Sequence, residues 1–307
     1  MIEVKGSLGA YREKRGNVKD TESPTPLCSD LLRPFLRWAG GKQKLVRSLL
    51  AFAPSSDGFK TYYEPFFGAG AMFFALQPAN AVLSDINSEL MNCYEQVARY
   101  PHAVGHLLRL YAKSDSPDFF YGVRALAVED LSLRQRAARF IYLNKAAFNG
   151  IYRVSKAGKF NVPYGPSFKG PAIPSTEALT LAAKCLRKAK ILSGDFEQIM
   201  SLAEDGDFVY LDPPYPPRSE TAYFTHYSVN RFGWDEQIRL ARVFCELSER
   251  GCYVMLSNAD QIKVTSLYRE FYISRLSVVR WLGSNGDRFR VREIVVTNYK
   301  TSEVGRG

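Results

Sequence analysis

The sequence predicts an α/β fold of the Rossmann-like, nucleotide-binding type that is interrupted by a mainly helical insertion. Short apolar runs alternate with amphipathic helical segments over 61–87 and again over 176–258, which is the pattern of a mainly parallel sheet. Residues 88–175 have helical spacing and contain no clear strand. We therefore expect a discontinuous α/β domain over 33–87 and 176–304, an inserted domain over 88–175, and a flexible N-terminal extension over 1–32.

The extension over 1–32 contains Gly, Ser, Pro and Thr with scattered charge and little apolar periodicity, a composition typical of disordered segments. A basic arm that binds nucleic acid is the functional alternative. Across the whole chain, 41 basic residues against 31 acidic ones give a net charge of +10. This charge favours a polyanionic partner.

The composition also predicts a soluble intracellular protein. The five cysteines are scattered, without a Cys-x-x-Cys pair, so we interpret them as reduced thiols. No apolar run approaches the ~18 residues of a membrane span, and the N-terminal residues lack a signal-peptide core. His102 and His106 have i, i+4 spacing, but no third ligand is near them, so we expect no metal site.

The ordered part begins with a glycine turn at 40–41, which precedes a helical pattern over 43–50. The turn suggests a phosphate loop, but that motif needs Gly at 36 and Ser or Thr at 43, where this chain has Leu and Gln. Arg37, Trp38 and Lys42 surround the turn. These side chains suit a ligand that carries an aromatic or sulfonium group together with an acidic group.

A strand over 61–67, a turn from Gly68 to Gly70 and a helix over 71–76 form the first strand-turn-helix unit of a nucleotide-binding fold. A second short strand over 81–85 ends in Asp85, where dinucleotide-binding folds place the acid that binds ribose hydroxyls. The third glycine of the dinucleotide fingerprint is missing. This pattern indicates a ligand that contains adenosine without a pyrophosphate.

The inserted region contains predicted helices over 88–100, 103–111 and 133–148. The segment over 144–165 mixes Lys and Arg with Asn, aromatic residues and glycine. Basic groups interleaved with planar side chains suit phosphate contacts, hydrogen bonds to base edges and stacking. A solvated turn region is the alternative interpretation.

The alternation of strands and helices resumes after the insertion. Helices are predicted over 176–188 and 234–250, and strands over 190–195, 207–211 and 252–258. A hairpin over 271–299 follows, with the favoured turn sequence Asn285-Gly286. Four arginines near this turn bind phosphates or keep the hairpin soluble: Arg280, Arg288, Arg290 and Arg292.

The strand over 207–211 ends in Asp212-Pro213-Pro214-Tyr215, at the edge where open sheets bind ligands. The two prolines restrict the backbone, so the carbonyl of Pro213 is held in one direction. Asp212 and this carbonyl can each accept a hydrogen bond from an exocyclic amino group, and Tyr215 offers a ring on which a base can stack. The motif predicts chemistry on the amino group of adenine or cytosine, with a plain proline turn as the alternative.

Six sequence blocks occur in a specific order, at 35–42, 64–70, 85–87, 160–165, 212–215 and 284–286. In this order and spacing they resemble the Dam family of DNA adenine-N6 methyltransferases, over nearly all of residues 34–299. The resemblance implies a Rossmann-like methyltransferase sheet with an inserted, mainly helical DNA-recognition domain. It also implies S-adenosylmethionine as methyl donor and a flipped adenine in double-stranded DNA as acceptor.

The resemblance assigns roles to individual residues. Trp38, Lys42 and the loop over 64–70 would bind the donor, through Glu64, Pro65, Phe66, Gly68 and Gly70 of that loop. Asp85 would bind the ribose hydroxyls, and Asp212 would contact both donor and acceptor. Pro213, Pro214 and Tyr215 complete the catalytic motif. No metal is implied, because the sulfonium already supplies a good leaving group.

The resemblance also points to the target sequence. In family members that methylate GATC, residues matching Arg37 and Arg153 contact guanine, and residues matching Ile151 and Pro163 contact thymine. We therefore expect GATC as the target. Further DNA contacts are expected at Phe148, which would enter the base stack, and at Asn149, Lys159, Asn161, Ser284 and Asn285. One departure lies at 166–168, where this chain has Pro-Ser-Phe instead of the Arg and Tyr of GATC readers.

Two other functions stay open. A related enzyme could act on cytosine N4, RNA adenine or a glutamine amide, although the leading Asp and the helical insertion disfavour it. A DNA-binding protein with a degenerate site is disfavoured by the complete set of expected residues. We expect double-stranded DNA as partner, a restriction endonuclease as a candidate partner, and no membrane association. We also expect a monomer, or several copies on DNA, in the cytoplasm or at the nucleoid of a bacterial or phage host.

Overall fold

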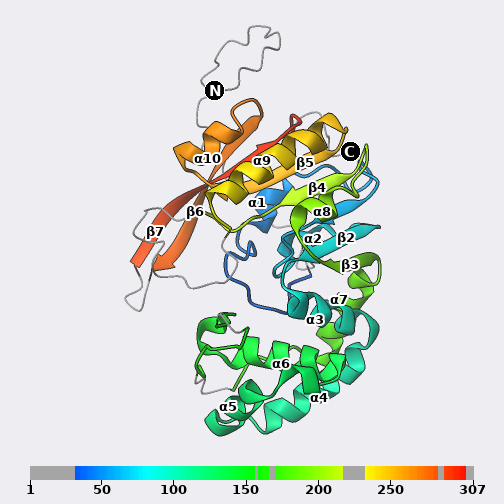
Figure 1. The fold of residues 1–307 in the computed structure, drawn as a ribbon, viewed down its shortest axis with the longest axis vertical. Coiled ribbons are helices and arrows are strands. Elements are labelled where there is room, and N and C mark those ends of the chain that lie inside the picture. Colours follow the sequence, from blue (N-terminus) through cyan, green and yellow to red (C-terminus); the bar gives the residue numbers. More distant parts are fainter. Residues whose placement is uncertain (1–31, 156–157, 166–169, 217–231, 283–286, 302–307) are drawn as a thin grey trace. The chain divides into compact units, whose positions relative to one another are not determined.

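The computed structural model describes residues 32–155, 158–165, 170–216, 232–282 and 287–301. In this part of the chain, seven strands form one sheet in the order β3-β2-β1-β4-β5-β7-β6 (Figure 1). The strands β1 to β5 are parallel, and β7 runs antiparallel to β5 and β6. The predicted α/β class is confirmed. The strand bounds are β1 Tyr62–Glu64, β2 Ala81–Asp85, β3 Ala189–Ser193, β4 Phe208–Leu211, β5 Tyr253–Ala259, β6 Tyr272–Leu282 and β7 Asp287–Thr297.

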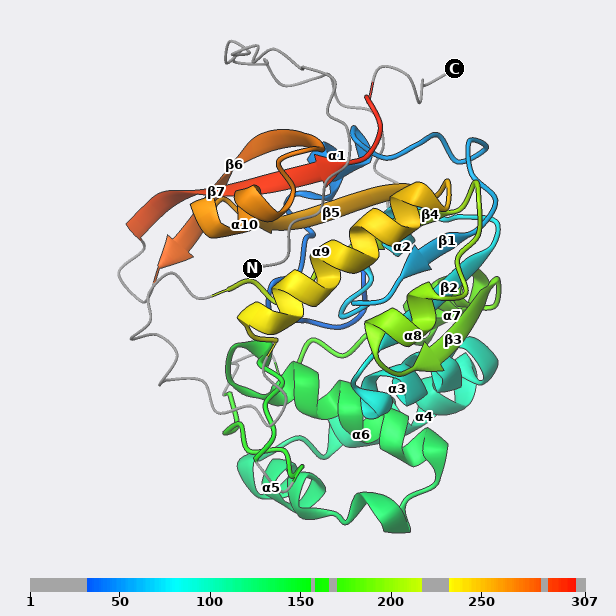
Figure 2. The same cartoon turned by 45° about the horizontal axis from the view of Figure 1, so that its top comes forward.

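Helices cover both faces of the sheet, as expected for strands that are apolar on both sides. α8 (Phe196–Met200), α9 (Trp234–Glu249) and α10 (Ile262–Leu267) pack on one face, in an apolar cluster with Val209 and Leu211 of β4. Figure 2 shows α9 lying along β4 and β5, with α1 (Val46–Leu50) and α2 (Ala71–Leu76) behind the sheet. Alternation along β4 therefore turns Tyr210 away from α9, toward the face that also holds Ser257.

The side of the sheet on which successive strands are added reverses between β1 and β4. From β1 the chain continues to β2 and then β3, whereas from β4 it continues to β5 on the opposite side. The carboxyl ends of β1 and β4 are neighbours, because these two strands are parallel and paired. Open α/β sheets bind ligands at such a switch point. It brings the loop after Glu64 next to the motif that begins at Asp212.

The insertion is built from helices that follow β2. They are α3 (Ser88–Arg99), α4 (Pro101–Lys113), α5 (Pro117–Ala125) and α6 (Leu133–Ala146), with short 3-10 turns at Val128–Asp130 and Phe148–Gly150, and α7 (Thr176–Leu186) leads back to β3. α6 begins with a capping box in which Ser132 and Gln135 satisfy each other's backbone N–H groups. After α6, two isolated bridges, Ala147 to Tyr164 and Val154 to Phe160, close a compact loop. Apart from these bridges, the described part of the insertion contains no strand.

Several element boundaries differ from the prediction. The helix expected over 43–50 begins at Val46, and the strand expected over 61–67 ends at Glu64. The short helices α5, α8 and α10 were not predicted, because helices of five to nine residues depend on tertiary packing more than on their own sequence. The hairpin β6–β7 is confirmed, but its turn, with Ser284 and Asn285, lies outside the described residues. Residues 1–31 of the expected extension also lie outside them.

Candidate active site

A cavity of about 960 Å³ lies at the carboxyl ends of β1 to β4. It is lined by residues 38–42, 64–72, 85–86, 194–196, 210 and 212–215, together with Tyr152, Phe232, Glu236 and Arg239. All of the residues predicted to bind the donor, and all four of the predicted catalytic motif, lie on this wall. The fold therefore brings four separate sequence blocks to one cavity.

Asp212 is held at the end of β4 by two polar partners. Lys42 Nζ lies 2.7 Å from Asp212 Oδ1, and Ser257 Oγ donates a hydrogen bond of 2.8 Å to the same oxygen. Among the described residues, none donates to Asp212 Oδ2. Burial raises the pKa of this carboxyl group, and the Lys42 ammonium opposes the increase. The free oxygen can accept a hydrogen bond from a ligand.

The main chain after Asp212 is fixed by an amide relay. Gln237 Nε2 donates a hydrogen bond of 3.0 Å to the carbonyl of Pro214, and Asn258 Nδ2 donates one of 3.0 Å to Gln237 Oε1. Both amides are fully buried. No described residue donates to the carbonyl of Pro213. This carbonyl is therefore held in place while its oxygen stays available to an amino group.

Tyr215 presents an aromatic ring at the cavity wall. Its hydroxyl donates a hydrogen bond of 2.9 Å to Glu293 Oε2 of β7, which fixes the ring orientation. Burial and the nearby carboxylates raise the pKa of this phenol well above its ordinary value, so the hydroxyl remains a donor. Lys42 Nζ lies 4.5 Å from the ring centroid. A planar, electron-poor ligand can stack on such a ring.

Asp85 ends β2 and binds the glycine turn. Asp85 Oδ2 accepts a hydrogen bond of 3.0 Å from Gly68 N, and Oδ1 accepts one of 3.0 Å from Asn87 N. Burial raises the pKa of Asp85, and these backbone donors oppose the increase. Gly68 has a φ of 48°, and a Cβ there would lie 2.7 Å from Trp38 Cδ1. Only glycine allows this turn to pack against Trp38.

Glu64 is a buried carboxyl group on the cavity wall, only 3% exposed. The hydroxyl of Tyr62 donates a hydrogen bond of 2.7 Å to Glu64 Oε2. Burial raises the pKa of Glu64 well above its ordinary value, and Asp212 and Asp85 add to this effect. A cationic ligand group in the cavity would stabilise the ionised form of this carboxyl group.

The aromatic ring of Trp38 connects the α/β part to the insertion. Its ring stacks on Tyr152 at a centroid distance of 5.3 Å and on Phe140 of α6 at 6.2 Å. Trp38 and Tyr152 both line the cavity. Side chains from the glycine turn and the insertion therefore form one aromatic wall of the site.

The backbone of Arg37 is clamped by Asn144 of α6. Asn144 Oδ1 accepts a hydrogen bond of 2.9 Å from Arg37 N, and Asn144 Nδ2 donates one of 2.7 Å to Arg37 O. Asn144 is fully buried. Gly150, at a φ of 64°, lies against the Arg37 side chain, and a Cβ at this glycine would collide with Arg37 Cδ. Arg37 is thus fixed beside the loop that contains the other predicted DNA contacts.

The predicted DNA contacts of the insertion lie in this same loop. Phe148 and Ile151 are exposed, at 51% and 42% respectively. Arg153 Nε donates a hydrogen bond of 2.8 Å to Asn161 Oδ1, and Phe148 N donates one of 3.0 Å to Pro163 O. Asn149 has a φ of 55°, and Lys159 N donates to Ser155 Oγ in the turn before Phe160. Ser284 and Asn285 lie outside the described residues, as do residues 166–168.

Among the described residues, no group of three or more His, Cys, Asp or Glu side chains could hold a metal ion. No described helix is long and apolar enough to cross a membrane. The arrangement offers two acceptors in one motif, Asp212 and the carbonyl of Pro213, and the aromatic ring of Tyr215 on the wall of the same cavity. It suits group transfer to the amino group of a planar base.

Comparison with known families supports this chemistry. Residues 38–281 match the family described as D12 class N6 adenine-specific DNA methyltransferase. The chain belongs to this family. It is an adenine-specific DNA methyltransferase of the Dam type.

Several relatives match over most of their length. A type II methyltransferase of Lactococcus lactis subsp. cremoris is 40% identical over 275 residues, which cover 87% of this chain and 96% of the relative. A type II methyltransferase of Methanocaldococcus jannaschii is 37% identical, covering 87% of this chain and 99% of the relative. The DNA adenine methylase of Escherichia coli is 32% identical, covering 89% and 97%.

The methyltransferase cavity also contains residues that sequence reasoning missed. Asp195 and Phe196 follow β3, Tyr210 lies in β4, and Glu236 and Arg239 lie in α9. One signal could have found the first two, because Asp195 ends a predicted strand as Asp85 and Asp212 do. The residues of α9 gave no such signal, since they look like an ordinary charged helix surface.

Proposed function

We propose that this enzyme transfers a methyl group from S-adenosylmethionine to N6 of a flipped adenine in GATC. The observation that carries the reaction is a pair of acceptors to which no described residue donates, Asp212 Oδ2 and the carbonyl of Pro213, on a motif held by Lys42, Ser257 and Gln237. An adenine amino group has two N–H bonds, one for each acceptor. Hydrogen bonding to both would draw electron density toward the nitrogen. As the nitrogen bonds to the methyl carbon, the bond from that carbon to the sulfonium sulfur would break, and one N6 proton would pass to the acceptor at Asp212.

The residues present fit the donor. Glu64, a buried carboxyl group without a cationic partner among its described contacts, suits the donor's ammonium group. Asp85 is fixed at the end of β2, where an acid binds ribose hydroxyls. Trp38 and the turn at Gly68 and Gly70 complete this part of the wall. When bound, S-adenosylmethionine supplies an electrophilic methyl group on a sulfonium, which is a good leaving group.

Asp195 and Phe196 extend the donor site beyond the ribose. β3 lies next to β2 in the sheet, so the wall that follows β3 borders the part of the cavity beyond Asp85. The rings of Phe66 and Phe196 lie there at a centroid distance of 5.3 Å. We assign this aromatic end to the adenine of the donor, with Asp195 as an acceptor for its amino group.

We assign target recognition to the insertion over 88–175. Arg37 and Arg153 suit bidentate hydrogen bonds to guanine, and Ile151 and Pro163 suit the methyl group of thymine. The clamp from Asn144 and the bond from Arg153 to Asn161 support this assignment, because they hold the backbone of Arg37 beside the insertion and the side chain of Arg153 within it. The exposed ring of Phe148 is available to enter the base stack.

Methyl transfer from radiolabelled donor to a panel of duplexes tests the proposal. The panel contains GATC, its single-base variants and an unrelated adenine site, with RNA and cytosine-only duplexes as controls. We expect label in GATC adenine alone. Label in adenine of another motif would reject GATC but keep the enzyme class, whereas label in cytosine would reject the assignment of the acceptor.

A target other than GATC is the second candidate. The two type II methyltransferases are 40% and 37% identical to this chain, more than the DNA adenine methylase of Escherichia coli at 32%. A type II relationship also suggests a restriction endonuclease partner, whose sites this enzyme would protect. Sequencing methylated adenines in DNA from cells that express the chain would identify the motif, and digestion of that DNA would reveal protection.

A further inference from the structure

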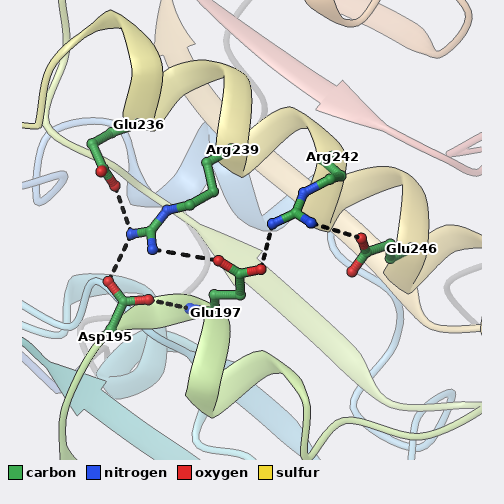
Figure 3. Close-up of polar contacts among 6 residues, drawn as sticks. All are labelled: Asp195, Glu197, Glu236, Arg239, Arg242 and Glu246. Atoms are coloured by element: carbon green, nitrogen blue, oxygen red, sulfur yellow. Dashed lines mark hydrogen bonds and ion pairs between the residues drawn. The ribbon is translucent and has the colours of Figure 1, made fainter.

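A compact ionic cluster joins the start of α9 to the segment after β3 (Figure 3). Arg239 Nη2 lies 2.7 Å from Asp195 Oδ2 and 2.6 Å from Glu236 Oε2, and Arg239 Nη1 lies 3.3 Å from Glu197 Oε2. The Arg239 guanidinium also lies 4.3 Å from the ring centroid of Phe196. One side chain therefore connects two chain segments that are more than forty residues apart.

Part of this cluster faces the donor cavity. Asp195, Phe196, Glu236 and Arg239 line the cavity, whereas Glu197 and Arg242 are not among its lining residues. Arg242 lies one turn further along α9 and pairs with Glu197 and Glu246 (Figure 3). The two arginines share a helix and a carboxylate partner, but only Arg239 reaches the wall.

Arg239 compensates charges that would otherwise repel each other. Its three carboxylate partners, Asp195, Glu197 and Glu236, are about one-third exposed, at 33%, 35% and 35% respectively. Each such ion pair by itself adds little to the stability of the fold, because water screens it. The bridge nevertheless fixes geometry, since Asp195 and Glu236 accept from the same nitrogen and are held close together.

Asp195 has limited freedom while the bridge is intact. Its Oδ1 caps α8 by accepting a hydrogen bond of 3.0 Å from Glu197 N, and its Oδ2 binds Arg239. Without Arg239, repulsion between Asp195 and Glu236 would rotate the Asp195 side chain, and the Phe196 ring would lose its cationic neighbour. Both effects occur at the end of the cavity that we assign to the donor adenine.

We infer that Arg239 is a positioning residue for donor binding, which holds Asp195 and Phe196 in the geometry that the donor adenine requires. This inference rests on the proposed donor site and adds a residue of α9 to it. Arg239 acts through Asp195 and Phe196 rather than through the reacting atoms. Its loss should therefore raise the donor dissociation constant and KM without a comparable effect on kcat at saturating donor.

Calorimetric titration of S-adenosylhomocysteine into the full-length Arg239→Met variant is the central experiment. We expect a dissociation constant about tenfold higher than that of the unmodified enzyme, the loss expected for a charged hydrogen bond. The DNA dissociation constant and the melting temperature should change little. Arg242→Met is the matched control, and it should leave the affinity for S-adenosylhomocysteine within about twofold because Arg242 does not line the cavity.

A double-mutant cycle tests whether Arg239 acts through Asp195. If it does, Arg239→Met in an Asp195→Asn background should weaken binding much less than in the original chain. Arg239→Lys provides a conservative variant that keeps the charge but lacks the planar fork, and it should restore only part of the affinity. This variant also covers the case in which Arg239→Met fails to fold.

Three outcomes would overturn the inference: unchanged affinity in Arg239→Met, full affinity in Arg239→Lys, or an equal loss in Arg242→Met. Failure of the underlying donor site has a different signature. In that case Phe196→Ala and Asp195→Asn would themselves leave the binding of S-adenosylhomocysteine unchanged. Measuring these two variants beside Arg239→Met separates the two failures.

Discussion

In the role that we propose, Asp212 accepts most strongly while it is ionised, and its burial opposes ionisation. Burial raises its pKa, and Lys42 at 2.7 Å limits the increase. Ser257 donates to the same oxygen as Lys42, so the second oxygen stays available. At the scale of single residues, the role that we propose for Asp212 therefore depends on Lys42 and Ser257, which favour its ionised form against the effect of burial.

Asp212→Asn should lower kcat by about 10² to 10³, because a neutral amide stabilises developing positive charge on the amino group far less. Labelled methyl transfer at saturating substrates measures this loss, and the DNA dissociation constant should not change. Asp205→Asn, an exposed position at the entrance to β4, is the control. Wild-type kcat in Asp212→Asn would contradict the assigned role.

The raised pKa of Asp212 also predicts how the rate depends on pH. As the pH falls through this raised pKa, Asp212 takes up a proton, loses its negative charge and becomes a weaker acceptor, so kcat should fall at a higher pH than for an ordinary carboxyl group. A pH series of single-turnover rates tests this. The residual activity of Asp212→Asn should not show this decrease at acidic pH.

Glu64→Gln should stabilise the fold while weakening donor binding. The pKa of Glu64 is raised in the folded state, so the folded protein binds the Glu64 proton more tightly than the unfolded chain does. The stability that this proton contributes is fully present at a pH below the pKa of the unfolded chain. It is lost as the pH rises through the pKa of the folded state. Glutamine cannot ionise, so the variant should not lose this stability as the pH rises. Its melting temperature should therefore exceed that of the original enzyme near neutral pH and match it more closely at acidic pH. Thermal unfolding across a pH series, with titration of S-adenosylhomocysteine, measures both effects; equal melting curves at every pH would refute the assignment.

Two elements meet at the clamp between Arg37 and Asn144. The glycine turn before α1 and the last turn of α6 are joined by two hydrogen bonds, although their residues are 107 positions apart. The amide of Asn144 satisfies both backbone groups of Arg37, much as a neighbouring strand would. This junction couples the donor wall to the loop that we assign to DNA recognition.

Asn144→Ala should lower stability by about 1 to 3 kcal/mol, because it removes two partly buried hydrogen bonds that satisfy the backbone N–H and C=O of Arg37. Discrimination between GATC and its variants should also decrease, while the affinity for S-adenosylhomocysteine stays within about twofold. Chemical denaturation and transfer assays on the duplex panel provide the measurements. Asn92→Ala is the control, since Asn92 makes one exposed bond on α3, to Leu133 O. Retained discrimination in Asn144→Ala would show that the clamp is purely structural.

The whole molecule carries a net charge of +10. We expect this charge to affect the affinity for DNA more than the affinity for the methyl donor. The logarithm of the DNA association constant should fall linearly with the logarithm of salt concentration, by about 0.9 per phosphate neutralised. Affinity for S-adenosylhomocysteine should depend far less on salt, because we assign this ligand to the cavity, where its binding would displace few counterions. Fluorescence anisotropy with DNA and calorimetry with S-adenosylhomocysteine over the same salt series compare the two; a flat DNA curve would exclude phosphate contacts as the main source of affinity.

The sequence by itself determined the class of this protein. Strands that end in Asp85 and Asp212, a glycine turn after the first strand, and a helical insertion with basic and aromatic residues were sufficient to predict the fold and chemistry on the amino group of a base. The resemblance of six ordered sequence blocks to the Dam family then implied an adenine methyltransferase. These features are local. Apolar runs, proline restriction and glycine turns act within a few residues, so they can be recognised without knowing the neighbours.

The tertiary structure decided how those blocks act together. The pair of Lys42 with Asp212, the clamp of Asn144 on Arg37, and the bridge of Arg239 to Asp195 join residues between 44 and 170 positions apart. No local pattern specifies such contacts, because they depend on the order of strands in the sheet and on the packing of α6 and α9 against it. The motif at Asp212 can thus be recognised from the sequence alone. The residues that hold it in a working geometry come next to it only when the chain folds.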